Sequence, residues 1–85
     1  MELTDTHCHI QFADYPVDAD TALSNAAAKG VTRLLAVGCA LPDSEAAVEL
    51  AARYDSVWAS IGLHPHEGSE YVENHQALQR FRELV

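Results

Sequence analysis

The stretch Thr4-Asp5-Thr6-His7-Cys8-His9-Ile10 lies close to the N-terminus, and the rest of the chain is organised around it. If this stretch forms a β-strand, alternate side chains share a face, which places Asp5, His7 and His9 on one side. Neighbours on one face are about 6.6 Å apart, because each residue advances the strand by about 3.3 Å. Two imidazoles at this spacing near a strand end can bind one metal ion. The alternative is two ordinary packed or surface histidines.

Strand and helix signals alternate three times along the chain. The expected strands cover residues 3–9, 31–38 and 57–63. The first expected helix is capped by Asp18 or Asp20 and closed by Lys29-Gly30, and the second carries Pro42 in its first turn. A polar loop from Glu67 to Glu70 precedes the third helix. Each helix has an apolar stripe: Ala22, Leu23, Ala26 and Ala27; Ala47, Leu50, Ala51 and Tyr54; and Leu78, Phe81 and Val85.

The short connections between these units predict parallel strands joined by right-handed crossovers. The spacing of the units is typical of a TIM-type (β/α)8 barrel, in which chemistry takes place at the C-terminal ends of the strands. Four of the five histidines are found at such ends. His7 and His9 end the first strand, and His64 and His66 end the third. The fifth, His75, lies within the last helix, where we expect a solvated surface residue.

The length of the chain bounds its architecture. A barrel of this type needs about 250 residues, whereas this chain has 85. We therefore expect residues 1–85 to be an N-terminal fragment, namely three β/α units of a single barrel domain. Such a fragment is expected to self-associate through exposed sheet edges and apolar helix faces. The alternative is a small three-stranded α/β protein with unpaired strand edges.

Composition excludes several classes of protein. Hydrophobic residues make up 48% of the chain, which argues against a disordered tail. No apolar run reaches the roughly 18 residues of a membrane span, and the acidic N-terminus lacks the basic start of a signal peptide. We therefore expect a cytoplasmic protein without a membrane partner. The net charge of −8 argues against broad, non-specific affinity for nucleic acid.

The cysteines and the large aromatic residues suggest structural roles. Cys8 and Cys39 are expected to be free thiols that do not coordinate metal, with Cys8 pointing away from the histidine face. Trp58 is expected to pack under a helix. Phe12 and Tyr15 are expected to cover a barrel end, although stacking on a nucleic-acid base is an alternative.

A second motif with residues suited to binding or catalysis is Gly62-Leu63-His64-Pro65-His66. Gly62 leaves the end of the strand open to close approach, and Pro65 stiffens the loop that follows. The two imidazoles are suited to contact a substrate near the metal, for example at an anionic oxygen. The alternative is a loop that is held by hydrogen bonds to histidine rings.

The two motifs together resemble the TatD-like family of metal-dependent hydrolases. The similarity rests on Asp5-Thr6-His7-Cys8-His9 and Ile61-Gly62-Leu63-His64-Pro65-His66, with support from Gly30-Val31 and from Asp43-Ser44 at a helix start. The His-x-His pair alone occurs across the wider amidohydrolase superfamily. Its combination with Gly-x-His-Pro-His is much more specific, and the resemblance covers essentially the whole chain.

The resemblance implies a (β/α)8 barrel enzyme with one or two divalent metal ions, Mg²⁺, Mn²⁺ or Zn²⁺, that acts as a deoxyribonuclease or related phosphodiesterase. It implies that His7 and His9 are metal ligands and that His64 and His66 contact the DNA or other phosphodiester substrate. The family's remaining ligands and its general base would lie beyond Val85, so the chain alone is expected to be inactive. Two alternatives are a barrel hydrolase of a small lactone, amide or ester, and a non-catalytic metal-binding or interaction module.

Overall fold

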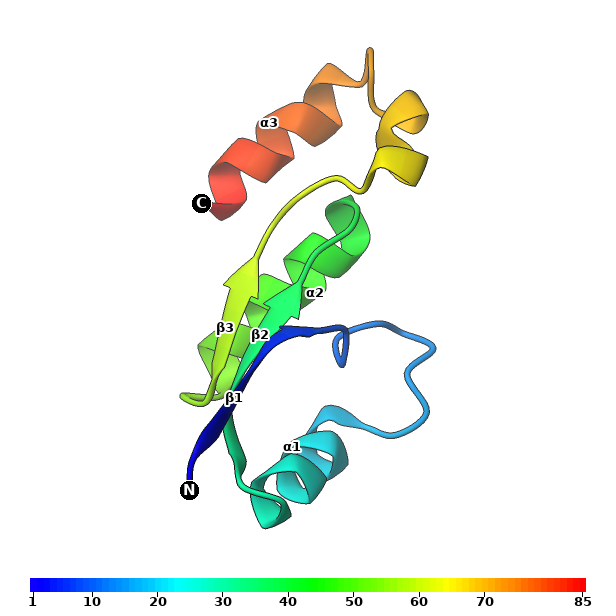
Figure 1. Ribbon diagram of the computed structural model, residues 1–85. Coiled ribbons are helices and arrows are strands. Elements are labelled where there is room, and N and C mark those ends of the chain that lie inside the picture. Colours follow the sequence, from blue (N-terminus) through cyan, green and yellow to red (C-terminus); the bar gives the residue numbers. More distant parts are fainter.

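A three-stranded parallel sheet with helices packed against it forms the centre of the computed structural model, which describes all 85 residues (Figure 1). The elements in chain order are β1 (Leu3–Cys8), α1 (Ala19–Ala28), β2 (Val31–Val37), α2 (Leu41–Arg53), β3 (Val57–Ser60), the 3₁₀-helix η1 (Pro65–Glu70) and α3 (His75–Leu84). The strand order is β1-β2-β3, and β2 pairs in parallel with both neighbours. The predicted alternation of parallel strands and helices is therefore confirmed.

Local side-chain chemistry determines where α1 begins and ends. Asp18 is the N-cap, because its Oδ1 accepts a hydrogen bond from the Thr21 amide at 2.7 Å. Of the two carboxylates that the sequence offered as caps, the structure thus uses the first. Lys29 is the C-cap, and Gly30 adopts a φ of 88°, a left-handed conformation that glycine reaches without steric penalty. The chain then turns directly into β2.

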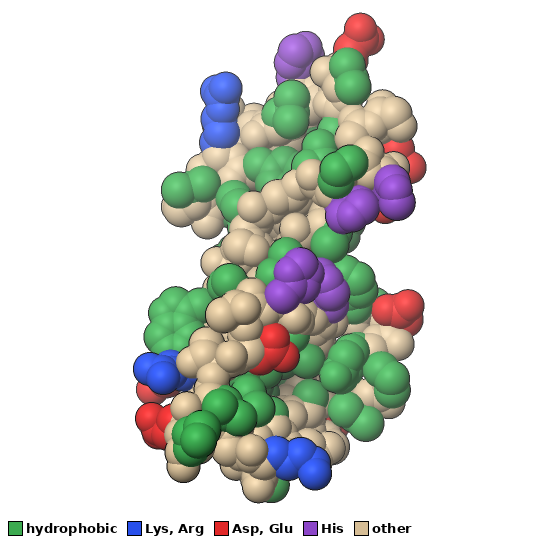
Figure 2. All heavy atoms as spheres, in the orientation of Figure 1, with side chains coloured by type: hydrophobic (Ala, Val, Ile, Leu, Met, Phe, Trp, Pro, Cys, Tyr) green, Lys and Arg blue, Asp and Glu red, His purple; other side chains and the backbone are tan.

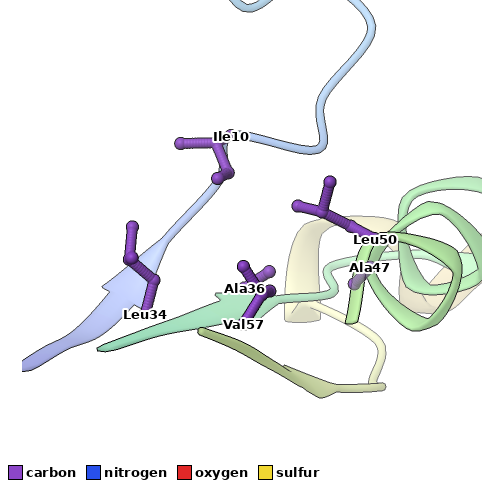
Figure 3. Packing of buried hydrophobic residues seen from close by; sticks show 6 residues of the cluster. All are labelled: Ile10, Leu34, Ala36, Ala47, Leu50 and Val57. Atoms are coloured by element: carbon purple, nitrogen blue, oxygen red, sulfur yellow. The ribbon is translucent and has the colours of Figure 1, made fainter. Parts of the chain in front are cut away.

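The hydrophobic core lies between α2 and one face of the sheet (Figure 3). Strand β2 contributes Leu34 and Ala36, and Val57 of β3 pairs with Leu34. Helix α2 presents Ala47 and Leu50, as its predicted stripe requires, and Ile10 closes the cluster next to β1. The side chains alternate along β2 with a period of two and recur along α2 at i and i+3, so both periodic patterns point to the same core.

The opposite face of the sheet is largely uncovered. Trp58 lies on this face, opposite Leu35 of β2, and is 53% exposed. The prediction that Trp58 packs under a helix is therefore wrong, because α2 covers the face that carries Val57 instead. Strands β1 and β3 each leave one edge unpaired. The radius of gyration of 13.7 Å exceeds the value of about 12 Å for a compact domain of this length.

Strand β3 ends at Ser60, earlier than the predicted residue 63. Beyond Ser60 the backbone leaves the ladder and crosses the end of β2. The Gly62 N–H and C=O groups hydrogen-bond to the Ser44 hydroxyl, and the His64 amide donates to the Cys39 carbonyl at 2.7 Å. These bonds satisfy the backbone groups that a longer strand would have used.

The segment after β3 is more regular than predicted. Residues 67–70, expected to be a loop, belong to η1. Pro65 occupies the first helical position, where its fixed φ is suitable and its missing N–H is not needed. The Glu67 amide donates to the His64 carbonyl at 2.8 Å, which closes the first turn.

Helix α3 packs on α2 at the end of the molecule opposite α1 (Figure 1). Asn74 caps it by accepting a hydrogen bond from the Ala77 amide at 3.0 Å, and Arg80 pairs with Glu45 of α2 at 3.5 Å. His75 is exposed at its first position, as predicted. The predicted apolar stripe is only partly used, because Phe81 is half-buried beside Tyr71 whereas Leu78 is 39% exposed and Val85 98% exposed. The buried residue of α3 is Ala77, which lies outside that stripe.

Candidate metal centre

The first histidine pair, His7 and His9, converges at the C-terminal end of β1. The Nε2 atoms of the two rings are 3.2 Å apart, and the rings meet edge to face with their centroids 4.9 Å apart. The prediction that both side chains point into the same space is confirmed. The Asp5 carboxylate accepts the His7 amide at 3.0 Å, so this acid braces the backbone of the pair.

A backbone carbonyl determines which nitrogen of His9 carries the proton. Nδ1 of His9 lies 2.9 Å from the carbonyl oxygen of Val37 on β2. Because a carbonyl only accepts, Nδ1 carries the proton, and Nε2 of the neutral ring keeps its lone pair. Metal-binding histidines typically donate their second N–H to such a partner, which holds the tautomer and the ring orientation.

The geometry of the pair fits two ligands of one divalent ion. Imidazole nitrogens bound at about 2.0–2.1 Å in a tetrahedral arrangement are about 3.3 Å apart, close to the 3.2 Å between the Nε2 atoms. In the neutral pair, Nε2–H of His7 donates to Nε2 of His9. For both Nε2 atoms to bind an ion, the proton of His7 would move to its Nδ1. No group of three or more His, Cys, Asp or Glu side chains is placed to hold a metal. The pair could therefore hold an ion with two of the roughly three protein ligands that a catalytic site needs.

Gln11 belongs to the same arrangement, although no motif in the sequence singled it out. Its Nε2 donates to the Val37 carbonyl at 2.9 Å, so that one oxygen accepts from both Gln11 and His9. The Gln11 Oε1 is buried without a hydrogen-bond partner. The reversed amide would place this oxygen against the Val37 oxygen and lose the bond, so the observed orientation is the favourable one.

Phe12 packs beside the first pair. Its ring centroid is 4.6 Å from that of His9, with the planes tilted by 32°. Phe12 is half-buried, whereas Tyr15 is 40% exposed. Phe12 therefore limits the rotation of the His9 ring and shields one side of it from water.

The second pair, His64 and His66, follows β3 and has a different hydrogen-bond pattern. Nδ1 of His64 accepts the His66 amide at 3.2 Å, which caps η1. Nδ1 therefore carries no proton, and the neutral His64 ring bears its hydrogen on Nε2. Nε2 of His64 is then a donor, suited to an anionic or carbonyl oxygen, whereas Nε2 of His9 is an acceptor.

Histidine side chains gather on one face of the molecule (Figure 2). A surface hollow at the ends of the strands is lined by the first pair, by Phe12 and by the ends of β2 and β3 with His64. His66 does not line this hollow. Of the four histidines that the sequence singled out for the site, the structure thus brings three together around one hollow.

The two cysteines are free, as predicted. The Cys8 thiol points away from the first pair, packs against the core and donates to the Leu35 carbonyl at 3.5 Å. Cys39 lines the hollow. Burial raises the pKa of the Cys39 thiol, and the nearby carboxylates of Asp43 and Glu67 raise it further, so Cys39 is a protonated thiol at neutral pH.

Comparisons with known proteins agree with the two motifs. The family described as TatD related DNase matches residues 4–85. The chain is 34% identical to the 3'-5' ssDNA/RNA exonuclease TatD of Cronobacter sakazakii over 95% of its own length and 30% of that protein. It is 34% identical to the uncharacterized metal-dependent hydrolase YabD of Bacillus subtilis over 84% of its length and 28% of that protein. It is 31% identical to YjjV of Escherichia coli, another uncharacterized metal-dependent hydrolase, over 89% of its length and 31% of that protein.

Proposed function

The chain belongs to the TatD-related DNase family, a family of TIM-barrel metal-dependent hydrolases, and on this premise we propose that the complete protein is a divalent-metal phosphodiesterase that cleaves DNA. The chain spans less than a third of the length of the curated relatives it matches. Residues 1–85 would supply the first three β/α units of a single barrel domain. The observation that carries the proposal is the convergence of His7 and His9 at the C-terminal end of the first strand, the rim used for chemistry in such barrels.

We propose that His7 and His9 hold the metal through Nε2. When bound, a divalent ion lowers the pKa of a coordinated water and polarises a phosphoryl oxygen. The Val37 carbonyl keeps the proton of His9 on Nδ1 and leaves Nε2 free for the ion. No residue of this chain is proposed as the general base, which would lie beyond Val85 with the remaining ligands. Mg²⁺, Mn²⁺ and Zn²⁺ are all candidates, since imidazole suits several divalent ions.

We propose that His64 contacts the substrate. Its Nε2–H can donate to an anionic oxygen of a phosphodiester without competing for the metal. Nδ1 of His64 accepts the His66 amide, so the proton cannot move there and stays on the nitrogen that would ligate. His66 contributes mainly through its amide, which holds the His64 ring, and its own ring is 4.7 Å from that of His64, centroid to centroid. The proposed substrate contact of His66 therefore lies at the margin of the hollow.

The substrate proposed here is a single strand that enters by its end. A relative described as a 3'-5' ssDNA/RNA exonuclease supports this choice. The net charge of −8 also favours it, because an acidic surface repels the backbone of a long duplex, whereas a strand end brings few phosphates to the protein.

We further propose a cytoplasmic location, supported by the two free cysteines, which reducing compartments maintain. None of the helices is both long and apolar enough to cross a bilayer.

The function can be tested with the complete protein and the 85-residue chain side by side on 3'-labelled single-stranded DNA with Mg²⁺, Mn²⁺ or Zn²⁺. We expect release of labelled mononucleotide by the complete protein only, and loss of that release in His7→Ala. The chain alone lacks ligands and a base, and a misplacement of about 1 Å at such a site can lower a rate about 100-fold. We also expect the chain alone to elute as oligomers in gel filtration, through its unpaired strand edges.

Two outcomes would overturn the proposal. A complete protein that is inert on DNA but hydrolyses lactones or esters would make it a different barrel hydrolase. Turnover by the 85-residue chain at the rate of the complete protein, abolished by His7→Ala, would show that three units form a sufficient site.

A further inference from the structure

Ser44 is a fully buried polar residue that joins α2 to the loop after β3. Its Oγ accepts the Gly62 amide at 3.2 Å and donates to the Gly62 carbonyl at 3.3 Å. A single hydroxyl can make both bonds, since it has one donor and two acceptor positions. Both hydrogen-bonding groups of Gly62 therefore depend on Ser44, and neither is left to the β-sheet.

Gly38, at the end of β2, is packed against the same side chain. A Cβ atom placed on Gly38 would lie 2.2 Å from the Ser44 Oγ and 2.9 Å from its Cβ. Such distances are not tolerated without displacement of the helix or the strand end. Three segments thus meet at one point: the end of β2, the first turns of α2 and the loop after β3.

The loop that Ser44 holds leads directly to His64. Between Gly62 and η1, the other backbone anchor is the bond from the His64 amide to the Cys39 carbonyl, at 2.7 Å. Cys39 is itself held, because its amide donates to the carboxylate of Asp43, the residue next to Ser44, at 2.5 Å. Adjacent residues of α2 therefore fix both backbone segments, and His64 lies where the two meet.

We propose that Ser44 is a positioning residue that sets the second histidine pair relative to the first. The hydroxyl clamps Gly62, the clamp fixes the path of Leu63 and His64, and this path places the His64 ring at the hollow that His7 and His9 line. The inference rests on the proposed function, because it assigns to the second pair the contact with substrate.

The clamp predicts that loss of the Ser44 hydroxyl changes KM of the complete protein but not its affinity for Mn²⁺. In Ser44→Ala we expect kcat/KM on single-stranded DNA to fall by about three- to tenfold through a higher KM, the range of one buried hydrogen bond. Mn²⁺ affinity should stay unchanged, because β1 and Val37 hold the first pair without Ser44. Ala47→Gly, a control at an equally buried position one turn further along α2, should lower the unfolding midpoint without raising KM.

A double-mutant cycle distinguishes positioning from general destabilisation. Once His64→Ala has removed the contact, Ser44→Ala should change KM no further. If Ser44→Ala had the same effect on KM with and without the His64→Ala substitution, or caused a parallel loss of Mn²⁺ affinity, the proposal would be overturned.

A measurement without turnover keeps this test separate from the proposed function. In Ser44→Ala, hydrogen exchange of the Gly62 and His64 amides should accelerate at least about tenfold more than that of the Leu34 amide, which donates to the Ser56 carbonyl in the sheet. Uniform acceleration at all three amides would overturn the clamp even if the protein is an active nuclease. Selective acceleration in a protein that is inert on DNA would support the clamp and overturn only the nuclease assignment.

Discussion

The two histidine pairs have the same spacing in sequence and opposite hydrogen-bond chemistry in the structure. His9 donates from Nδ1 to a carbonyl of the neighbouring strand, so its Nε2 offers a lone pair. His64 accepts at Nδ1 from the amide two residues further on, so its Nε2 offers a proton. The first pair is oriented by the sheet and the second by its own loop. The proposed roles of the two pairs therefore rest on the Nδ1 partners of His9 and His64 rather than on the i and i+2 spacing.

The largest expected difference between the pairs concerns metal affinity. In the complete protein, His9→Ala should weaken Mn²⁺ binding by more than about 100-fold, because removal of a ligand exceeds the effect of losing its hydrogen-bond partner. His64→Ala should leave that affinity unchanged and raise KM instead. Calorimetric titration with Mn²⁺ measures the first effect and steady-state kinetics on single-stranded DNA the second.

His75→Ala is the matched control for both variants, because this imidazole is exposed at the start of α3 and belongs to neither pair. It should change neither the affinity for Mn²⁺ nor KM. If His64→Ala weakened Mn²⁺ binding as strongly as His9→Ala, the contrast between the pairs would be wrong.

An intermediate effect is expected from the loop that carries the second pair. Pro65→Ala should lower the free energy of unfolding by less than about 1 kcal/mol, because the unfolded chain gains freedom while the folded loop keeps its bonds. Loss of the fixed φ at residue 65 also leaves the folded loop less restricted, so KM should rise about two- to fivefold. Chemical denaturation measures the free energy of unfolding, and steady-state kinetics measure KM. A change in Mn²⁺ affinity would show that the loop also orients the first pair.

The difference between the pairs also explains what the sequence could predict. Periodicity is a local property, so the alternation of β1, the stripe of α2 and the shared face of His7 and His9 were all accessible. The tautomer of His9 was not, because Val37 is far from His9 in sequence and becomes its partner only once β1 and β2 pair. The metal role of the first pair and the substrate role of the second stay predictions.

The errors have a similar origin. Trp58 was expected under a helix, but the register between β2 and β3 places Val57 on the covered face. Strand β3 was expected to continue to residue 63, but a serine on α2 takes both backbone groups of Gly62. No motif singled out Gln11, and Ser44 was noted only as part of the Asp43-Ser44 helix start. Their partners lie far away in sequence, because Gln11 donates to the Val37 carbonyl and Ser44 bonds to both backbone groups of Gly62.

The smallest effect should come from a change remote from both pairs. The side chain and amide of Thr21 hydrogen-bond to the Asp18 carboxylate and lower its pKa. A lowered pKa in the folded state stabilises the protein above the unfolded pKa of about 3.9, and this contribution is lost as pH falls through the folded value. Asp18→Ala should therefore slightly lower stability to urea near neutral pH, and the gap to the unsubstituted protein should narrow in acid.

This last variant also sharpens the comparison of the pairs. Helix α1 contacts β2 but lies at the end of the molecule away from the hollow, and its cap carboxylate is exposed (Figure 1). Loss of the cap should fray only the first turn of α1, so neither Mn²⁺ affinity nor KM should change at neutral pH. A gap in urea stability that is the same in acid as at neutral pH would contradict the role of the ionised carboxylate. A change in KM would show that the position of the second pair depends on the whole fold, and the contrast with Ser44 would then lose its meaning.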